Sequence, residues 1–279
     1  MPPPMGTTAP VPAPQPAPAP SPLPAPGAPA PGGSAVTSPV PSSPAPPPGS
    51  PDRGWTEAPV FSIVRVQIRD MRAFGDYLVG HLPTIGAFGG RFLAAGAMPQ
   101  PVEGDWPLRR MIVHQWPLAQ AFFQWYESSP YVPWRQIRQR AADTDMVLLQ
   151  GVAPAGPSSA SSALPHSGPA ATQRPAFAIA DVAVHDDAAF ARYAQGQAAP
   201  LRAAGGVLLA ASGHFEVIEG TWQPRRLLLQ RWPSLAAYRT WYDSPAYRPW
   251  RDLRWKAAQA DIALFEGLSE AEKGERSMP

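Results

Sequence analysis

The stretch Trp125-Tyr126-Glu127-Ser128-Ser129-Pro130-Tyr131-Val132-Pro133-Trp134-Arg135 has a second version later in the chain. That version reads Trp241-Tyr242-Asp243-Ser244-Pro245-Ala246-Tyr247-Arg248-Pro249-Trp250-Arg251, and each of its residues lies 116 positions after its counterpart. The same offset joins further pairs: Phe61 and Phe177, Gly89-Gly90 and Gly205-Gly206, Glu103-Gly104 and Glu219-Gly220, and Trp116-Pro117 and Trp232-Pro233. A fixed period over so long a stretch indicates two copies of one domain.

The duplication divides the chain into two similar domains with low-complexity segments around them. Repeat 1 is expected at 55–152 and repeat 2 at 176–268, followed by a C-terminal tail at 269–279. Half of the 40 prolines lie in the first 50 residues, where no Asp, Glu, Lys or Arg occurs. Such a segment lacks the apolar side chains that offset the cost of ordering, so residues 1–54 predict a disordered Pro/Ala-rich tail. Residues 153–175 predict a flexible linker.

Each copy predicts strands and helices in the order β-α-β-β-α-β. In the first copy, residues 60–68 show the alternation typical of a strand. Asp70 suits a helix N-cap, and Gly89-Gly90 suits a helix end that needs left-handed backbone. The later elements are a short strand at 91–95, an edge strand leading into a loop at 102–106, a strong strand at 109–116, a second helix around Trp125 and a last strand at 146–150. A Ser-Pro pair interrupts the second helix, and the sequence leaves open whether it restarts at Pro130 or at Pro133.

The predicted fold class is α+β. The order of elements is that of the ferredoxin-like unit, in which two helices cover one side of a four-stranded sheet. The other side of such a sheet needs a partner, and a second copy in the same chain can supply it. We therefore expect two ferredoxin-like repeats paired as an intrachain pseudodimeric α/β barrel. The sequence does not specify whether this unit assembles into a higher oligomer.

The motifs shared by the two copies resemble those of a known family. In the second copy they are Gly205-Gly206, Glu219-Gly220-Thr221-Trp222 with Arg225-Arg226, and the stretch from Trp241 to Tyr247 leading to Arg251 and Arg254. With these motifs each copy resembles the DUF1330 family, in the dimeric α/β-barrel superfamily. The resemblance implies the ferredoxin-like fold and the pairing of sheet faces into a barrel. It implies no activity, although relatives in the wider superfamily include cofactor-free monooxygenases, isomerases and haem enzymes.

The two copies differ in charge at one position of the first strand. Asp181 resembles the acidic residue usual there in the family, whereas the first copy has Arg65. If a pseudo-twofold axis relates the copies, these side chains occupy related places and attract each other, which would favour the pairing of unlike copies. The alternative is a pair of solvated charges at the strand margin.

Composition argues against several classes of function. The chain has no cysteine, and its histidines and carboxylates show no metal-ligand spacing, so no metal site is expected. The formal net charge is only +2 and acids are interspersed among the arginines, so no nucleic-acid partner is expected. No run of about 20 apolar residues predicts a membrane span. No signal peptide is recognisable, and the default expectation is a cytoplasmic protein.

His114 is the one candidate catalytic residue. It lies in the strong strand, on the same face as Arg110, and its ordinary pKa suits a general base. An open pocket beside it would also suit haem ligation. Its counterpart is Gln230, so either role would be confined to repeat 1. The simpler alternative is a packed strand histidine, and we assign no cofactor.

The candidate ligand-binding residues recur in both copies. They are Arg110, Arg226, Tyr131, Arg135, Tyr247 and Arg251. Arginines beside aromatic rings could form a cleft for an aromatic or acidic small molecule, with guanidinium groups binding a carboxylate. The spacing of three to four residues equally fits a helix face packed on the sheet.

Three functions remain open on this basis. The first is binding of a small organic molecule in or beside the barrel. The second is a cofactor-independent enzyme, monooxygenase-like or isomerase-like, acting on a small organic acid or aromatic. The third is a non-enzymatic structural or interaction module, with the proline-rich tail as its docking element. The sequence does not decide whether the protein is an enzyme.

Overall fold

The computed structural model describes residues 54–153 and 173–277. The predicted tail lies outside this part except for Gly54, and so does most of the predicted linker. Repeat 1 contains β1 (Val60–Ile68), α1 (Met71–Ala87), β2 (Arg91–Ala97), β3 (Gln100–Glu103), β4 (Arg110–Trp116), α2 (Ala119–Tyr126), α3 (Val132–Ala141) and β5 (Ala142–Gln150). Repeat 2 contains β6 (Ala176–Val184), α4 (Asp187–Ala203), β7 (Val207–Ser212), β8 (Phe215–Glu219), β9 (Leu227–Trp232), α5 (Leu235–Tyr242), α6 (Arg248–Ala257) and β10 (Ala258–Glu266), followed by α7 (Glu270–Ser277).

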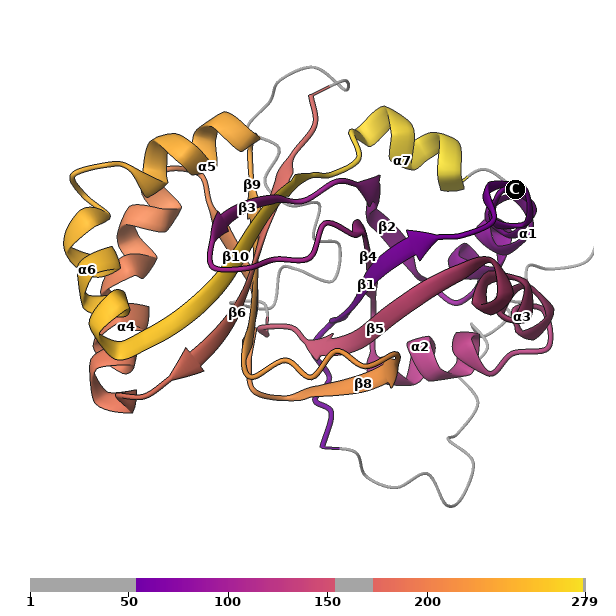
Figure 1. Cartoon of the computed structure of the whole chain (residues 1–279), viewed down its shortest axis with the longest axis horizontal. Helices are drawn as coiled ribbons and strands as arrows, with labels where there is room; N and C mark the ends of the chain where they lie inside the picture. The colour runs from indigo at the N-terminus through magenta and orange to yellow at the C-terminus, as the bar shows by residue number, and fades with distance from the viewer. Residues whose placement is uncertain (1–53, 154–172, 278–279) are drawn as a thin grey trace, which may run out of the picture. The chain divides into compact units, whose positions relative to one another are not determined.

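Each repeat contributes one strand to the sheet of the other repeat (Figure 1). The first sheet has the order β2-β4-β1-β5-β8 and the second β3-β10-β6-β9-β7, with antiparallel neighbours throughout. The first strands β1 and β6 lie at the centre, as predicted. The predicted edge strand is at an edge, but of the other repeat's sheet, because β3 pairs with β10 and β8 with β5. This exchange extends each four-stranded ferredoxin-like sheet to five strands.

The helix boundaries follow from local sequence. Asp70 caps α1, accepting hydrogen bonds from the backbone N–H groups of Arg72 and Ala73. The helix ends before Gly89, whose φ of 74° lies in the left-handed region that glycine adopts at low cost. After the Ser-Pro interruption α3 begins at Val132, with Pro133 in its first turn. The restart left open by the sequence therefore lies at Pro133, where the missing N–H costs no helical hydrogen bond.

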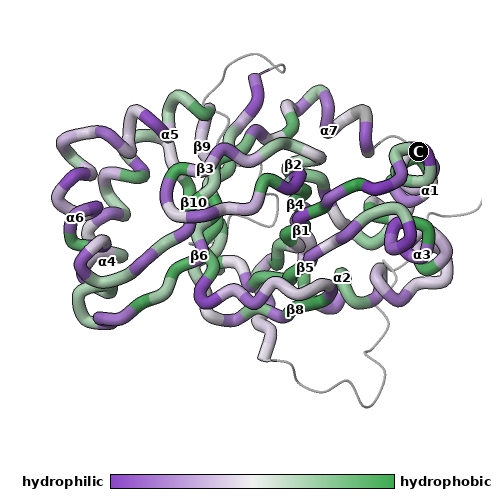
Figure 2. The backbone as a smooth tube through the Cα atoms, in the orientation of Figure 1, coloured by the Kyte–Doolittle hydropathy of each residue, from purple (hydrophilic) through white to green (hydrophobic). Residues whose placement is uncertain are grey.

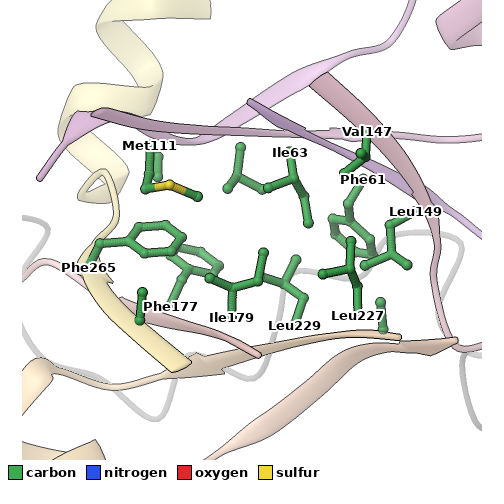
Figure 3. Close-up of a cluster of buried hydrophobic side chains, with 14 of the residues drawn as sticks. Phe61, Ile63, Met111, Val147, Leu149, Phe177, Ile179, Leu227, Leu229 and Phe265 are labelled. Carbon is green, nitrogen blue, oxygen red and sulfur yellow. The ribbon is translucent and has the colours of Figure 1, made fainter. Parts of the chain in front are cut away.

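Apolar side chains from both sheets pack together between them (Figure 3). Phe61, Ile63 and Met111 of the first sheet face Phe177 and Ile179 of the second, and each is at most 2 % exposed. Figure 2 shows hydrophobic residues concentrated along the central strands. Each sheet thus covers the face that the other repeat's helices leave open, which confirms the predicted pseudodimeric barrel.

The helices lie on the outer faces of the two sheets. Helices α1, α2 and α3 cover the first sheet, and α4, α5 and α6 cover the second (Figure 1). The segment predicted only as a C-terminal tail contains α7, which crosses to repeat 1 and contacts β2 and α1. A helix from the end of repeat 2 therefore joins the helical layer of repeat 1.

The turn after each exchanged strand needs glycine. Gly220 follows β8 with a φ of 84°, and Oδ1 of Asp145 accepts hydrogen bonds from the next two N–H groups, Thr221 at 2.9 Å and Trp222 at 3.2 Å. A Cβ on Gly220 would lie 2.3 Å from that oxygen. Gly104 in repeat 1 has a φ of 65° and meets Asp261 in the same way.

The glutamate before each of these glycines bonds to the other repeat. Glu219 accepts hydrogen bonds from Arg138 at 2.5 and 3.0 Å and one from the hydroxyl of Tyr126. Glu103 likewise accepts hydrogen bonds from Arg254 and Tyr242. We call the two glutamates and these partners the interlock. It explains the recurrence of the Glu-Gly motif and of Arg138 and Arg254 in both copies.

Arg65 and Asp181 each have partners within their own repeat. Arg65 lies opposite Asp145 in the β1–β5 ladder and donates to its carboxylate at 2.9 Å. Asp181 accepts from the backbone N–H and the Nε of Arg225 at 2.9 and 3.2 Å. The predicted attraction between Arg65 and Asp181 acts only at longer range, because each side chain pairs with a closer charged residue. Arg65 does contact the other repeat, since its guanidinium lies 4.0 Å from the ring centroid of Trp222.

Candidate functional site

A cavity of about 340 Å³ lies between α1 and the outer face of the first sheet. We call it the repeat-1 cavity. Aromatic rings from α1, β2 and α2 contribute to its wall, namely Phe74, Tyr77, Phe92 and Trp125. Its volume falls within the roughly 300–1,000 Å³ of small-molecule sites, and its lining is mainly apolar with a few polar groups, as such sites require. The cavity is beside the barrel core rather than within it.

His114 projects from β4 into the wall of this cavity and is 4 % exposed. Its Nδ1 lies 2.9 Å from Oγ of Ser62, which receives the indole N–H of Trp116 at 3.1 Å. The Ser62 hydroxyl can then donate its own proton to Nδ1, and this arrangement places the ring proton of a neutral His114 on Nε2. That buried Nε2 has no hydrogen-bond partner among the described residues.

His81 adds a second histidine to the cavity, from α1, and is 2 % exposed. Its Nδ1 lies 2.8 Å from the carbonyl oxygen of Tyr77, which can only accept, so Nδ1 carries the proton and Nε2 a lone pair. The ring stacks on Tyr77 with centroids 4.0 Å apart. The two histidines that line the cavity therefore differ: His114 has a ring nitrogen that can donate, and His81 has one that can accept.

Both histidines are neutral at pH 7. Burial lowers the pKa of His114 from 6.5 to about 3 and that of His81 to about 4, because an imidazolium loses its hydration there. Hydrogen bonding of His81 to backbone carbonyls opposes this shift without cancelling it. The wall thus offers uncharged hydrogen-bonding groups.

Arg138 carries a buried charge in the wall that Glu219 compensates. The two side chains are 3 % and 12 % exposed. Burial alone would raise the pKa of Glu219, but its hydrogen bonds and attraction to Arg138 lower it below its usual 4.5. Glu219 belongs to β8, so a residue of repeat 2 neutralises a charge in the wall of a cavity in repeat 1.

Two further arginines line the cavity, Arg110 from β4 and Arg276 from α7. Arg110 is exposed, and its Nη1 donates to the carbonyl oxygen of Gly96 at 3.0 Å. The guanidinium carbon of Arg276 lies 5.8 Å from the ring centroid of Phe92. Met71, which also lines the cavity, is 70 % exposed.

The corresponding region of repeat 2 has a cavity of only about 30 Å³. Gln197 and Gln230 stand where repeat 1 has His81 and His114. Gln230 accepts the indole N–H of Trp232 at 3.1 Å. Arg226, the counterpart of Arg110, lies over the ring of Phe190 at 5.4 Å and 4.0 Å from a carboxylate oxygen of Asp187.

The candidate residues from the sequence separate into two groups. Arg110 and His114 line the repeat-1 cavity, and Tyr247 lines the repeat-2 cavity. Tyr131 is fully buried against Trp125, with ring centroids 3.9 Å apart. Arg135 of α3 and Arg251 of α6 donate to the carbonyl oxygens of Tyr126 and Tyr242, the last residues of α2 and α5, at 2.9 and 3.0 Å. Arg226 does not line the repeat-2 cavity and contacts Phe190 and Asp187 instead.

Sequence reasoning singled out His114 but passed over His81. The signal for His81 was its position on α1, since Phe74, Tyr77, His81 and Ile85 share the buried face at helical spacing. The described residues contain no group of three or more metal-ligating side chains close enough to hold an ion. Within the same residues, no helix is long and apolar enough to cross a membrane.

Comparison with known proteins gives a family. The sequence model described as "Domain of unknown function (DUF1330)" matches twice, at residues 59–152 and 175–268. No curated protein matches the chain.

Several solved structures are similar to this one. A chlorite dismutase mutant from Candidatus Nitrospira defluvii is 12 % identical, with a TM-score of 0.47, over 80 % of this chain and 98 % of its own. A haem-binding protein from Thermus thermophilus is 9 % identical, with a TM-score of 0.44, over 80 % and 97 %. A protein of unknown function from Rhodopseudomonas palustris is 20 % identical, with a TM-score of 0.32, over 36 % and 87 %.

Proposed function

We propose that this chain, which belongs to the DUF1330 family, binds a small organic molecule in the repeat-1 cavity. One observation supports the proposal most directly: His114 lines a cavity of about 340 Å³, and its buried Nε2 has no partner among the described residues. A buried donor without a partner costs about 1–3 kcal/mol, which a ligand that accepts from it would recover. The aromatic wall suits a flat apolar body, and His81 and His114 suit a polar edge.

A thermal-shift screen of the full chain tests this proposal, with small organic acids, neutral aromatics and haem as probes. Binding to the folded state raises the melting temperature with ligand concentration, by an amount equivalent to about 2.7 kcal/mol at a hundred times Kd. We expect a dose-dependent shift with at least one organic probe. The His114→Gln variant, which carries the residue of repeat 2, should reduce it.

A cavity-filling pair separates this site from any other. Gly75 of α1 lines the cavity, and Gly86 of the same helix does not; a Cβ on either would meet no atom within 4 Å. Gly75→Leu should abolish the shift while Gly86→Leu preserves it. Equal shifts in both variants would contradict the proposed site. No shift with any probe would leave the interaction module as the better description, and a haem Soret band lost in His114→Gln would replace the proposal with a haem site.

The neutral histidine pair supports a second candidate, a cofactor-independent enzyme. His81 could accept a proton from a bound substrate at Nε2 while His114 donates a hydrogen bond to the oxygen on which negative charge develops. The test is a His81→Gln variant, which should keep ligand binding and lose turnover of any bound compound found to react. A cytoplasmic location and the lack of a nucleic-acid partner stay predictions from the sequence.

A further inference from the structure

The charges at the repeat-1 cavity narrow the class of ligand, on the premise that the proposed binding function holds. We propose that the ligand is an aromatic carboxylic acid, with its ring inside the cavity and its carboxylate bound by Arg110 of repeat 1 and Arg276 of α7. The site is then completed by α7, the helix that follows repeat 2 in the chain.

The balance of charge supports an anionic ligand. Among the described residues, three arginines and no aspartate or glutamate line the cavity. Glu219 compensates Arg138, whereas no ion pair joins Arg110 or Arg276 to another described side chain. Glu272, four residues before Arg276 on α7, attracts that guanidinium only at longer range. Neither histidine adds positive charge at neutral pH. Two guanidinium groups without an ion pair to a described side chain lie on one apolar cavity, and they could bind a carboxylate by charge-assisted hydrogen bonds.

In repeat 2, an acidic residue lies beside the arginine that corresponds to Arg110. Its Arg226 has Asp187 within 4.0 Å, in the first turn of α4. The residue of repeat 1 at that position is Met71, so Arg110 lacks the neighbouring, solvent-exposed carboxylate that its counterpart has. The repeat with the larger cavity is thus also the one whose arginine has no acidic neighbour at this position. A ligand carboxylate would take the place of Asp187.

The shape of the wall supports an aromatic body. Phe74, Tyr77, Phe92 and Trp125 line the space beyond the two arginines. Arg276 already lies over Phe92, so a ring entering below it would bring its carboxylate within reach of that guanidinium. Gly96 fixes Nη1 of Arg110 and leaves the Nη2 of that side chain for the carboxylate.

The test compares the binding of 1-naphthoate and its neutral isostere 1-naphthamide to the full chain by calorimetry. Naphthoate should bind about tenfold more tightly or better, as expected for a hydrogen-bonded charge. Arg276→Gln and Arg110→Gln should each remove about tenfold of naphthoate affinity and leave that of naphthamide within about twofold.

Two further variants separate the local effect from the net charge. Met71→Asp should weaken naphthoate alone, because it copies Asp187; an acid in the first turn of α1 is also favourable for the helix. Lys273→Gln removes a charge from α7 at a residue that does not line the cavity, and it should change neither affinity.

The possible outcomes distinguish this inference from the proposed function. Equal affinities of acid and amide in the wild type, or variants that weaken both probes alike, would overturn the carboxylate site while small-molecule binding stands. A loss of naphthoate affinity in Lys273→Gln equal to that in Arg276→Gln would also overturn it, since net charge would then explain the preference. Binding of neither probe would count against both proposals.

Discussion

The two repeats have the same fold and the same interlock, yet the corresponding cavities between helix and sheet differ about tenfold in volume. Glu219 bonds to Arg138 and Tyr126 in repeat 1 just as Glu103 bonds to Arg254 and Tyr242 in repeat 2. The two cavities measure about 340 and 30 Å³. Residues that hold the halves together are duplicated, whereas His81 and His114 are not. Stability therefore constrains both copies of the interlock, and we infer that ligand binding involves one repeat.

Breaking the interlock should cause the largest loss of unfolding free energy among these variants, and the loss should be similar in the two repeats. Glu219→Gln leaves the guanidinium of Arg138 buried without its counter-charge, and such a change typically costs about 3–5 kcal/mol of unfolding free energy. Glu103→Gln should cost a similar amount, because Arg254 is equally buried. Urea denaturation measures both. Arg69→Gln is the control, since its ion pair with Asp143 is half exposed and worth at most about 1 kcal/mol. A loss no greater than this control in either variant would contradict the interlock.

Acid should destabilise the protein through the two histidines of repeat 1. In the unfolded chain they take up protons below pH 6.5, while in the folded state they stay neutral down to about pH 4 and about pH 3. The contribution of the two neutral histidines to the free energy of unfolding is therefore fully present above pH 6.5. It falls as the pH drops towards 4, by up to about 1.4 kcal/mol per pH unit for each histidine. Unfolding by urea at pH 7.5, 6.0 and 5.0 should show a flatter profile for a double His81→Gln, His114→Gln variant. The same slope in both proteins would disprove this assignment.

Alanine at the interlock turns should have a moderate effect. Gly220→Ala puts a Cβ 2.3 Å from Asp145 and forces a left-handed backbone on alanine, so we expect a loss of about 1–3 kcal/mol. Gly104→Ala in the other repeat should match it. Gly86→Ala, on the exposed side of α1, should be neutral or stabilising by about 0.5–1 kcal/mol. Thermal denaturation measures the stability of the three variants. Similar stability changes for Gly220→Ala and Gly86→Ala would refute the role of the turn.

The smallest effect is expected when histidine is placed in repeat 2. Gln230→His gives that repeat the residue of repeat 1, but a space of about 30 Å³ holds no organic ligand. The naphthoate stoichiometry should stay at one per chain, with a stability change below about 1.5 kcal/mol. Calorimetry measures the stoichiometry, and a value of two would show that the histidine rather than the cavity decides binding.

The sequence predicts the repeat architecture well because its signals are local. Periodic apolar residues, Asp70 as a cap and the left-handed Gly89 each act within a few positions of the chain. The exchange of β3 and β8 has no local signal, because an edge strand has the same pattern whichever sheet it joins. The partner of Glu219 likewise depends on tertiary packing, although the recurrence of Glu-Gly and Arg in both copies indicated that these residues matter.

The site was only partly predictable. Arg110 and His114 were inferred from their shared strand face, and both line the repeat-1 cavity. His81 lies on a helix face that otherwise packs against the sheet, so its place in a cavity depends on the space left by side chains around it. Arg276 could not be inferred, because no sequence pattern indicates that the end of repeat 2 reaches repeat 1. Tyr131 and Arg135 were predicted to bind a ligand but do not line the repeat-1 cavity, because their spacing fits packing as well as binding.

The strand exchange also sets an order of events during synthesis on the ribosome. Glu103 meets Arg254, and the two are 151 residues apart in the chain. At roughly 5–20 residues per second, β3 would wait about 8–30 s before its partner strand is made. When repeat 1 emerges, β5 therefore lacks its neighbour β8, β3 lacks its neighbour β10, and Arg138 lacks the carboxylate of Glu219. Its maturation is completed after translation of repeat 2, so truncated products of this gene should be substrates for chaperones and proteases rather than functional half-molecules.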